Sequence, residues 1–228
     1  NGCSSATENV VVTVNPTPVQ TITNNDAVVC EGVGVNIDYT SPTAGATMTV
    51  QAVYPGAVTG GTYAAATPLA PVTGTITEAL GNTSSTPQTV TYTFTTSAGG
   101  CTDAVKSVDV VVNPTPVFTG TPYASTICSG TALGFNPTSD VTGATFSWTS
   151  AISGNITGNS ATGSGTITDV LVNTGNAVET VTYTITVTGP ATESCVNPVT
   201  EDYVVTVNPT PVQTITNNDA VVCEGVGV

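Results

Sequence analysis

Histidine is absent from this 228-residue chain, and Lys106 is its only basic residue, against 15 acidic residues and a formal net charge of −14. Neutralising nucleic-acid phosphates takes several Lys and Arg side chains, so nucleic acid is close to excluded as a partner. Without histidine a Ser/His catalytic triad is impossible. Aromatic residues are only 5% of the chain, too few to line the sugar cleft of a paired-carboxylate glycosidase. The sequence therefore predicts a protein that is not an enzyme.

Long apolar runs are missing too. None approaches the roughly 18 residues of a spanning helix, so we expect no membrane insertion in this segment. No signal peptide is visible and the first residues resemble a strand ending, which indicates a window from a longer chain. Charged residues are 7% of the chain, and Thr alternates with Val over long stretches. β-branched residues in alternation are typical of half-buried β-strands.

The chain repeats itself at two scales. Residues 11–35, VVTVNPTPVQTITNNDAVVCEGVGV, recur letter for letter at 204–228, a shift of 193 residues. Inside this period the tetrapeptide NPTP begins at Asn15, Asn113 and Asn208, at steps of 98 and 95 residues. Such a period is too long for a solenoid repeat and suits a β-sandwich domain.

The repeats predict four pieces. Residues 1–14 are the last strand of a preceding domain. Residues 15–112 (the first repeat) and 113–207 (the second repeat) are complete domains. Residues 208–228, a copy of 15–35, are the first strand of a following domain.

Each complete repeat shows short alternating runs broken by Gly, Pro, Asn or Ser, and no helical stretch. We expect one buried face to carry Val90, Tyr92 and Phe94. A second buried face should carry Val33, Val35, Ile37 and Tyr39. The single tryptophan, Trp148, lies on such a run, which favours a core position over a carbohydrate-stacking platform. The predicted fold is all-β: tandem immunoglobulin-like antiparallel β-sandwiches joined by NPTP linkers.

The NPTP linkers have a mechanical interpretation. Proline fixes φ, extends the residue before it and cannot donate to a β-ladder, so the last strand of each domain should end there. The result is a short, semi-rigid connector. The linker residues are Asn15, Pro16, Pro18, Asn113, Pro114, Pro116, Asn208, Pro209 and Pro211.

The combined pattern of these motifs resembles the PKD-like, Ig-like repeats of large Bacteroidetes-type surface proteins. It reads VTVNPTP, then VCEG or ICSG, then TVTYT, then GC or SC, and again VTVNPTP. The resemblance covers the entire chain. It implies secretion to the bacterial cell surface, very long parent chains, and roles in adhesion, gliding motility or filament formation, but no defined ligand.

Six cysteines without histidine or a CxxC pair indicate disulfides in an oxidising compartment rather than zinc. The simplest pairing joins the early and late cysteines within each repeat, Cys30–Cys101 and Cys128–Cys195. A standard immunoglobulin topology would place these partners at opposite ends of a domain, so the alternative is an interdomain bond, Cys30–Cys195. Cys3 and Cys223 lack partners within the window.

Acidic residues are the only other candidates for a site, and they are scattered. They include Asp26, Glu31, Asp38, Asp103, Asp109, Asp140, Asp169 and Glu179. No DxDxDG-type calcium loop occurs. The one calcium candidate is the run Asn24, Asn25 and Asp26, for which an ordinary turn is the alternative. No other cofactor is expected.

These observations favour a structural repeat region of an extracellular surface fibre or adhesin stalk, forming an extended rod or filament. The alternative is a binding module whose repeats hold polysaccharide or a protein partner, which an exposed aromatic platform would favour. The expected partners are neighbouring repeats of the same chain and identical chains in a filament. Terminal half-domains could be completed in line or by another chain's strand.

Overall fold

The computed structural model describes residues 2–103, 105–120, 123–190 and 195–216, and no helix occurs in them. The chain forms two compact units. Unit 1 comprises Asn1–Val117 with Ser139–Thr145 and Val187–Asn197. Unit 2 comprises Phe118–Thr138, Phe146–Thr186 and Pro198–Val228. Unit 1 therefore contains residues 1–14, the first repeat and three short segments of the second repeat, 113–117, 139–145 and 187–197.

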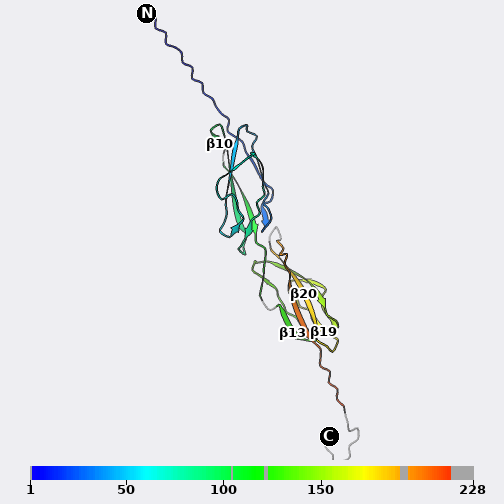
Figure 1. Cartoon of the computed structure of the whole chain (residues 1–228). Coiled ribbons are helices and arrows are strands. Elements are labelled where there is room, and N and C mark those ends of the chain that lie inside the picture. The colour runs from blue at the N-terminus through cyan, green and yellow to red at the C-terminus, as the bar shows by residue number, and fades with distance from the viewer. Residues whose placement is uncertain (1, 104, 121–122, 191–194, 217–228) are drawn as a thin grey trace, which may run out of the picture. The chain divides into compact units, whose positions relative to one another are not determined.

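Unit 1 is a sandwich of two sheets (Figure 1). The larger sheet has the order β2 (Val28–Cys30), β11 (Lys106–Asn113), β9 (Gln88–Ala98), β4 (Thr47–Val53) and β6 (Thr67–Leu69), with β10 (Cys101–Thr102) added to β9. The smaller has the order β1 (Thr21–Asn24), β3 (Ile37–Thr40) and β7 (Thr73–Ile76). A further pair joins β5 (Val58–Thr59) to β8 (Gly81–Asn82). Neighbouring strands are antiparallel, except that β2 runs parallel to β11.

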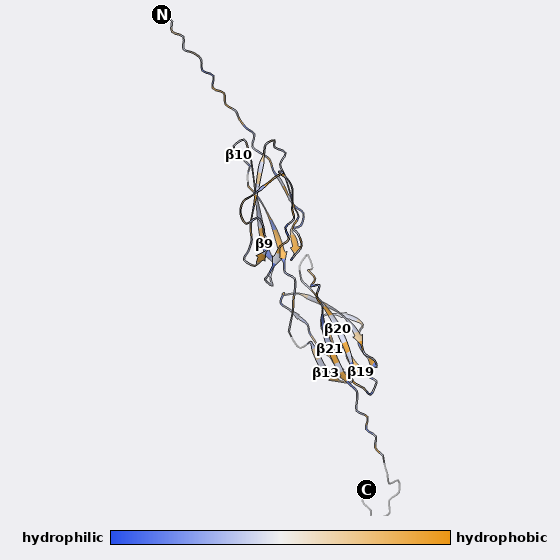
Figure 2. Ribbon diagram, in the orientation of Figure 1, coloured by the Kyte–Doolittle hydropathy of each residue, from blue (hydrophilic) through white to orange (hydrophobic). Residues whose placement is uncertain are grey.

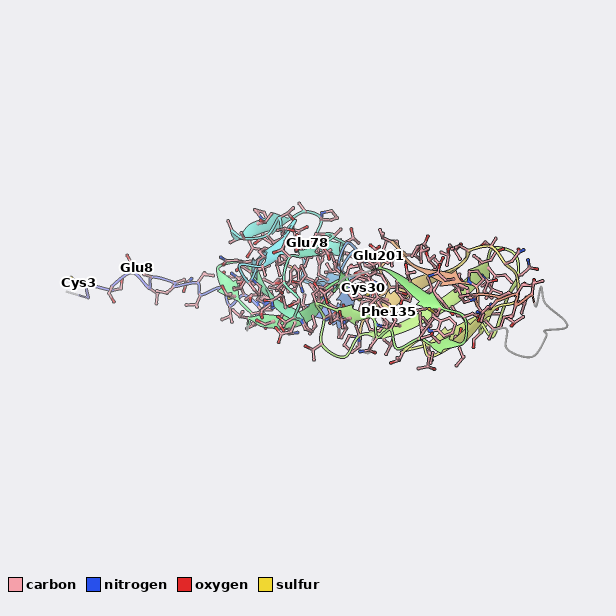
Figure 3. All side chains as sticks on the ribbon, turned by 90° about the horizontal axis from the view of Figure 1, so that it is seen from below. Cys3, Glu8, Cys30, Glu78, Phe135 and Glu201 are labelled. Carbon is pink, nitrogen blue, oxygen red and sulfur yellow. A yellow bond between two sulfur atoms is a disulfide. The ribbon has the colours of Figure 1, made fainter. Side chains whose placement is uncertain are left out.

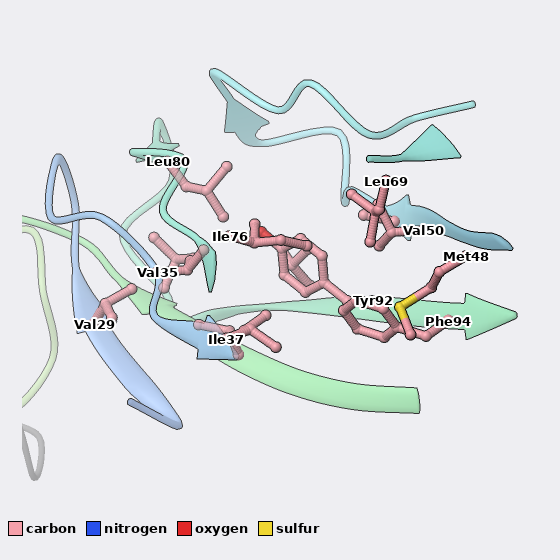
Figure 4. Close-up of a cluster of buried hydrophobic side chains, with 14 residues drawn as sticks. Val29, Val35, Ile37, Met48, Val50, Leu69, Ile76, Leu80, Tyr92 and Phe94 are labelled. Carbon is pink, nitrogen blue, oxygen red and sulfur yellow. The ribbon is translucent and has the colours of Figure 1, made fainter. Parts of the chain in front are cut away.

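The core of unit 1 fills the space between the two sheets (Figure 4). Strand β9 contributes Val90, Tyr92 and Phe94, all 0% exposed, and the smaller sheet contributes Ile37 and Ile76. The threonines between the buried residues of β9 lie on its other face. Period-two alternation therefore separates a buried face from a polar one, as predicted. In Figure 2 the hydrophobic colour is concentrated on the strands.

Unit 2 repeats this plan. Its main sheet has the order β13 (Ala124–Cys128), β21 (Glu201–Asn208), β20 (Glu179–Thr188), β16 (Thr145–Ile152) and β18 (Thr162–Ser164). The second sheet has the order β14 (Thr131–Ala132), β19 (Val170–Asn173) and β17 (Ile156–Thr157). A short pair joins β12 (Phe118–Thr119) to β15 (Thr138–Ser139). Strand β13 is parallel to β21, the counterpart of the β2–β11 pair.

Trp148 is a core residue of unit 2, as the alternation predicts. It is 6% exposed and meets Tyr183 edge to face, with ring centroids 5.3 Å apart. Gly163 is its partner on the neighbouring strand β18. A Cβ atom at Gly163 would lie 2.1 Å from Cζ2 of the indole, so the ring occupies the space above a residue that must lack a side chain.

One predicted buried position is wrong. Val35 and Ile37 are 1% and 0% exposed, but Val33 is 52% exposed and Tyr39 is half-buried. The cause is a turn before the strand: Gly32 has φ 79°, and Val33 N–H donates to Cys30 O at 3.0 Å. Strand β3 begins only at Ile37, so the alternation does not extend back to Val33. The all-β sandwich prediction itself is confirmed.

Candidate functional site

The Cys30–Cys195 disulfide is the main chemical feature of unit 1, with Cα atoms 5.5 Å apart. Cys30 (Figure 3) ends β2 of the first repeat, and Cys195 belongs to the second repeat, 165 residues further along the chain. The structure therefore contains the interdomain alternative. It contradicts the preferred pairing, Cys30–Cys101 and Cys128–Cys195.

Strand topology explains the first half of this correction. Cys30 pairs with Asn113 at the end of β11, whose neighbour Val112 pairs with Gln88, the first residue of β9. Cys101 pairs with Ala98, the last residue of β9. At about 3.3 Å per residue, an 11-residue strand separates these two ends by about 30 Å. That distance is far beyond the reach of a disulfide.

The second repeat follows the same logic. Cys128 pairs with Asn208 at the end of β21, whose neighbour Val207 pairs with Glu179, the first residue of β20. Val196, next to Cys195, bridges Thr188, the last residue of β20. The two cysteines are thus associated with opposite ends of one strand. Cys3, Cys101 and Cys128 are free thiols, and Cys223 lies outside the described residues.

The NPTP linker that begins at Asn113 is held from both sides within unit 1. We call residues 113–117 the connector. Strand β11 ends at Asn113, whose carbonyl accepts from Glu31 N–H at 2.9 Å, while Glu31 Oε2 accepts from Thr115 N–H at 3.4 Å. From the second repeat, Asn197 Nδ2 donates to Pro116 O at 2.9 Å, and Asp140 Oδ1 accepts from Val117 N–H at 2.7 Å. Groups from both repeats therefore fix the connector.

The other two linkers begin at Asn15 and Asn208. Asn15 Nδ2 donates to Gly99 O at 2.7 Å, Pro16 is exposed and Pro18 is buried. Strand β21 ends at Asn208, as the linker interpretation predicts, and Pro209 and Pro211 follow it outside any strand.

A half-buried carboxylate, Glu78 (Figure 3), gathers four hydrogen bonds in unit 1. Its Oε1 accepts from the hydroxyls of Tyr54 at 2.6 Å and Tyr92 at 2.5 Å. Its Oε2 accepts from Thr62 N–H at 2.8 Å and Thr62 Oγ1 at 2.7 Å. Charge-assisted bonds of this kind are among the stronger ones, so Glu78 fixes the segment around Thr62 to the core tyrosines.

Asp169 does the same in unit 2. Its Oδ2 accepts from Tyr183 Oη at 2.7 Å and Ser160 N–H at 2.8 Å, and its Oδ1 from Ser160 Oγ at 2.7 Å. Sequence reasoning placed Asp169 among scattered surface acids and missed this role. The available signal was the coincidence of two alignments between the repeats, Glu78 with Asp169 and Tyr92 with Tyr183.

Both tyrosines have a raised pKa, first because of burial and then because each hydroxyl donates to a carboxylate. Folding therefore favours the neutral phenol, whereas an unfolded tyrosine ionises near pH 10. We therefore expect the contribution of Tyr92 and Tyr183 to the free energy of unfolding to be constant below about pH 10 and to fall as the pH rises above it. The loss should be smaller in Tyr92→Phe. Urea unfolding by circular dichroism across alkaline pH tests this, and a tyrosinate signal from Tyr92 that precedes unfolding would contradict it.

The calcium candidates form a hydrogen-bonded turn. Asn24 Oδ1 accepts from Asp26 N–H at 3.2 Å, which is ordinary Asx-turn geometry. Asn25 Nδ2 donates to Asp38 Oδ2 at 2.9 Å, and Thr75 Oγ1 donates to Asp38 Oδ1 at 2.5 Å. These two bonds, the one from Thr75 first, hold the pKa of Asp38 below its usual value. The structure thus brings Asn25 to Asp38 through its amide nitrogen, not through its oxygen.

Within the described ranges, no three His, Cys, Asp or Glu residues group as metal ligands would. In the same residues, no helix is long and apolar enough to cross a membrane.

The family model of the PKD-like domain matches the chain twice, at residues 27–116 and 125–211. No curated protein matches it significantly. Solved structures similar to the chain include alpha-2-macroglobulin from Escherichia coli, at 13% identity over 86% of this chain and 22% of that one, with a TM-score of 0.36. Human mucin-like protocadherin EC1-2 matches at 12% identity, over 85% of this chain and 100% of that one, with a TM-score of 0.33. The human desmocollin-1 ectodomain matches at 13% identity over 85% and 42%, with a TM-score of 0.36.

These TM-scores are low, and the chain spans only about a fifth of the bacterial macroglobulin. The family assignment rests on the two family-model matches, which together cover most of the sequence. The PKD-like domain is a non-catalytic domain type. With two such domains in tandem, this chain belongs to the PKD-like domain family.

Proposed function

We propose that the chain is a structural repeat region of an extracellular surface fibre or adhesin stalk, forming an extended rod. The observation that carries the proposal is the connector. It is clamped by Glu31 from the first repeat and by Asn197 and Asp140 from the second, and the Cys30–Cys195 bond lies in the same unit. A covalent bond and several hydrogen bonds at a linker suit a shaft that must resist bending and proteolysis.

Burial of the aromatic residues favours this function over a module that binds polysaccharide. Every Phe, Tyr and Trp side chain of the sequence lies in the described ranges, and each is buried or half-buried. Sugar recognition of the stacking kind needs an exposed ring. The outer faces of β9 and β20 carry mainly threonine instead.

The partners in this proposal are neighbouring repeats of the same chain and identical chains in a filament at a bacterial cell surface. The proposal involves no cofactor, metal or nucleic acid. High acidity with one basic residue keeps such an array soluble and repels other negatively charged surfaces.

Small-angle X-ray scattering on the whole chain tests the proposal. We expect an extended particle whose distance distribution broadens in Cys30→Ser/Cys195→Ser, because the bond across the linker is lost. Cys101→Ser/Cys128→Ser removes two free thiols and should leave the distribution unchanged. A compact particle, or specific binding of the chain to a glycan array, would overturn the structural function.

A further inference from the structure

The early cysteine of the second repeat has the same local setting as Cys30. Cys30 pairs with Asn113 and Cys128 with Asn208, each the last residue of a closing strand and each in parallel register. The next residue, Glu31 or Ser129, donates its N–H to that asparagine carbonyl at 2.9 Å in both repeats. Cys128 is nevertheless an exposed free thiol.

The loop beside each early cysteine is held in the same way. Asn82 Nδ2 donates to Thr86 O at 2.9 Å and to Val112 O at 2.8 Å, which ties the loop before β9 to the closing strand. Asn173 Nδ2 donates to Ala177 O at 2.7 Å and to Val207 O at 2.9 Å, which ties the loop before β20. Both asparagines are buried. The second repeat therefore presents the same cysteine and the same ordered loop as the first.

A hollow beside the late cysteine also occurs in both repeats. A loop covers it in the second repeat and, among the described residues, no such loop lines it in the first. Around Cys195, a cavity of about 120 Å³ is formed by the connector with Val141, Thr142, Gly189 and Pro190, and is covered by Ser85, Thr86 and Pro87. Near Cys101, a hollow of about 90 Å³ is lined by Asn15, Pro16, Thr43, Ala44, Ala98 and Gly99. Asn15, Pro16, Thr43 and Ala44 lie 98 residues before Asn113, Pro114, Val141 and Thr142. The hollow near Cys101 therefore corresponds to the cavity around Cys195, but within the described ranges it has no covering loop, and Cys101 is a free thiol.

Cys101 is positioned on this linker. Its Sγ lies 3.7 Å from Asn15 O, and Gly99 packs so closely on the Asn15 side chain that a Cβ atom would lie 2.8 Å from Nδ2. Cys3 precedes Asn15 by twelve residues, as Cys101 precedes Asn113. Residues 2–14 lie outside any strand, but this spacing indicates that they are the closing segment of a repeat with the same late cysteine. Cys223 is the copy of Cys30 in the repeat that begins at Asn208.

We propose that the cysteines form a series of inter-repeat disulfides along the array, in which the early cysteine of each repeat bonds the late cysteine of the next. Cys128 bonds the late cysteine of the repeat that begins at Asn208. Cys101 bonds the early cysteine of the repeat that residues 1–14 close, and the loop of that repeat covers the hollow at Asn15. This inference rests on the proposed function in one respect, the continuation of the array.

Each bond of this inter-repeat disulfide series forms by thiol–disulfide exchange. The two cysteine thiols give up two protons and two electrons to the disulfide of an oxidant, which leaves as two thiols. In the cell the oxidant is a disulfide-carrying oxidoreductase of the export compartment, and oxidised glutathione supplies the same chemistry in the test tube.

The exact internal repeat allows a direct test. Since 204–228 reproduces 11–35, residues 1–228 followed by residues 36–228 continue the array without a foreign join. One variant carries Cys101→Ser in the first copy and Cys128→Ser in the second, so the first copy's Cys128 meets the next repeat's Cys101. The reciprocal variant keeps, of the Cys101 and Cys128 positions, the first copy's Cys101 and the second copy's Cys128. The proposed inter-repeat disulfides do not join these two cysteines.

Both variants are oxidised with glutathione and digested without reduction, and their linked peptides are identified by mass spectrometry. We expect a Cys128–Cys101 peptide in most molecules of the first variant, whereas Cys101 and Cys128 should both remain free thiols in the reciprocal one. The Cys30–Cys195 peptide reports correct folding in both. The inter-repeat disulfide series is overturned if the Cys30–Cys195 peptide forms while Cys128 stays reduced in the first variant. It is also overturned if both variants give the Cys128–Cys101 peptide, or if the Cys30–Cys195 peptide itself is absent.

Scattering on the first variant separates this inference from the proposed function. An extended particle with a reduced Cys128 would contradict the inter-repeat disulfides and support the proposed shaft. A compact particle that yields the Cys128–Cys101 peptide would contradict the shaft and support the inter-repeat disulfides.

Discussion

Replacing Cys30 and Cys195 by serine is expected to lower the free energy of unfolding of unit 1 by about 5 kcal/mol in the chain-entropy description of disulfides. The bond closes a loop with a sequence separation of 165 residues, so it removes much of the freedom of the unfolded chain. Cys195 is 3% exposed, so a serine there also places a hydroxyl in a buried position. Urea unfolding followed by circular dichroism measures the difference.

The free cysteines supply the matched control. Cys101→Ser/Cys128→Ser removes the same number of cysteines but no disulfide. Because Cys128 is exposed and Cys101 is half-buried, we expect a change within about 0.5 kcal/mol. Dithiothreitol should destabilise this control as much as the parent chain and leave Cys30→Ser/Cys195→Ser unaffected. Equal urea midpoints for the parent chain and both double variants would show that the bond does not restrain the chain.

Trp148→Ala is expected to destabilise unit 2 by about 3–5 kcal/mol, the usual cost of removing a large aromatic side chain from a core. The indole packs edge to face on Tyr183 and fills the space left by Gly163, so its removal opens a cavity between β16, β18 and β20. Unfolding should be followed by circular dichroism, because the substitution removes the only tryptophan of the chain and with it the tryptophan fluorescence.

Two substitutions sharpen this experiment. Thr149→Ala changes the exposed neighbour on the same strand and should cost within about 0.5 kcal/mol. Trp148→Phe keeps an aromatic ring, and within the described residues the indole Nε1 has no hydrogen-bond partner to lose, so its cost should be smaller than that of alanine. An alanine variant as stable as the parent chain would contradict the core position and reopen a ligand-stacking role.

The sequence predicted whatever depends on local patterns. Alternation of apolar residues and threonine placed Val90, Tyr92 and Phe94 on one buried face, because successive side chains of a strand point to opposite sides. It failed at Val33, where a glycine turn interrupts the strand, and periodicity alone cannot detect a backbone conformation with positive φ. The NPTP spacing gave the repeat length, because a duplicated domain leaves the same motif at each copy.

The carboxylate clusters needed the fold, although their members recur in both repeats. Glu78 and Asp169 each lie 14 residues before the tyrosine that they bind, on a different strand or loop, and only the packing of two sheets brings them into contact.

The disulfide shows most clearly what the tertiary structure decided. The sequence determined an all-β chain of tandem PKD-like repeats, with one early and one late cysteine in each complete repeat. It favoured pairing within a repeat, because spacing along the chain does not say at which end of a sheet a residue lies. The parallel register of β2 with β11 puts Cys30 at one end of unit 1, and the hairpin of β9 and β10 puts Cys101 at the other. Strand direction, a property of the assembled sheet, therefore excludes Cys101 as the partner of Cys30, and Cys195 of the second repeat bonds it instead.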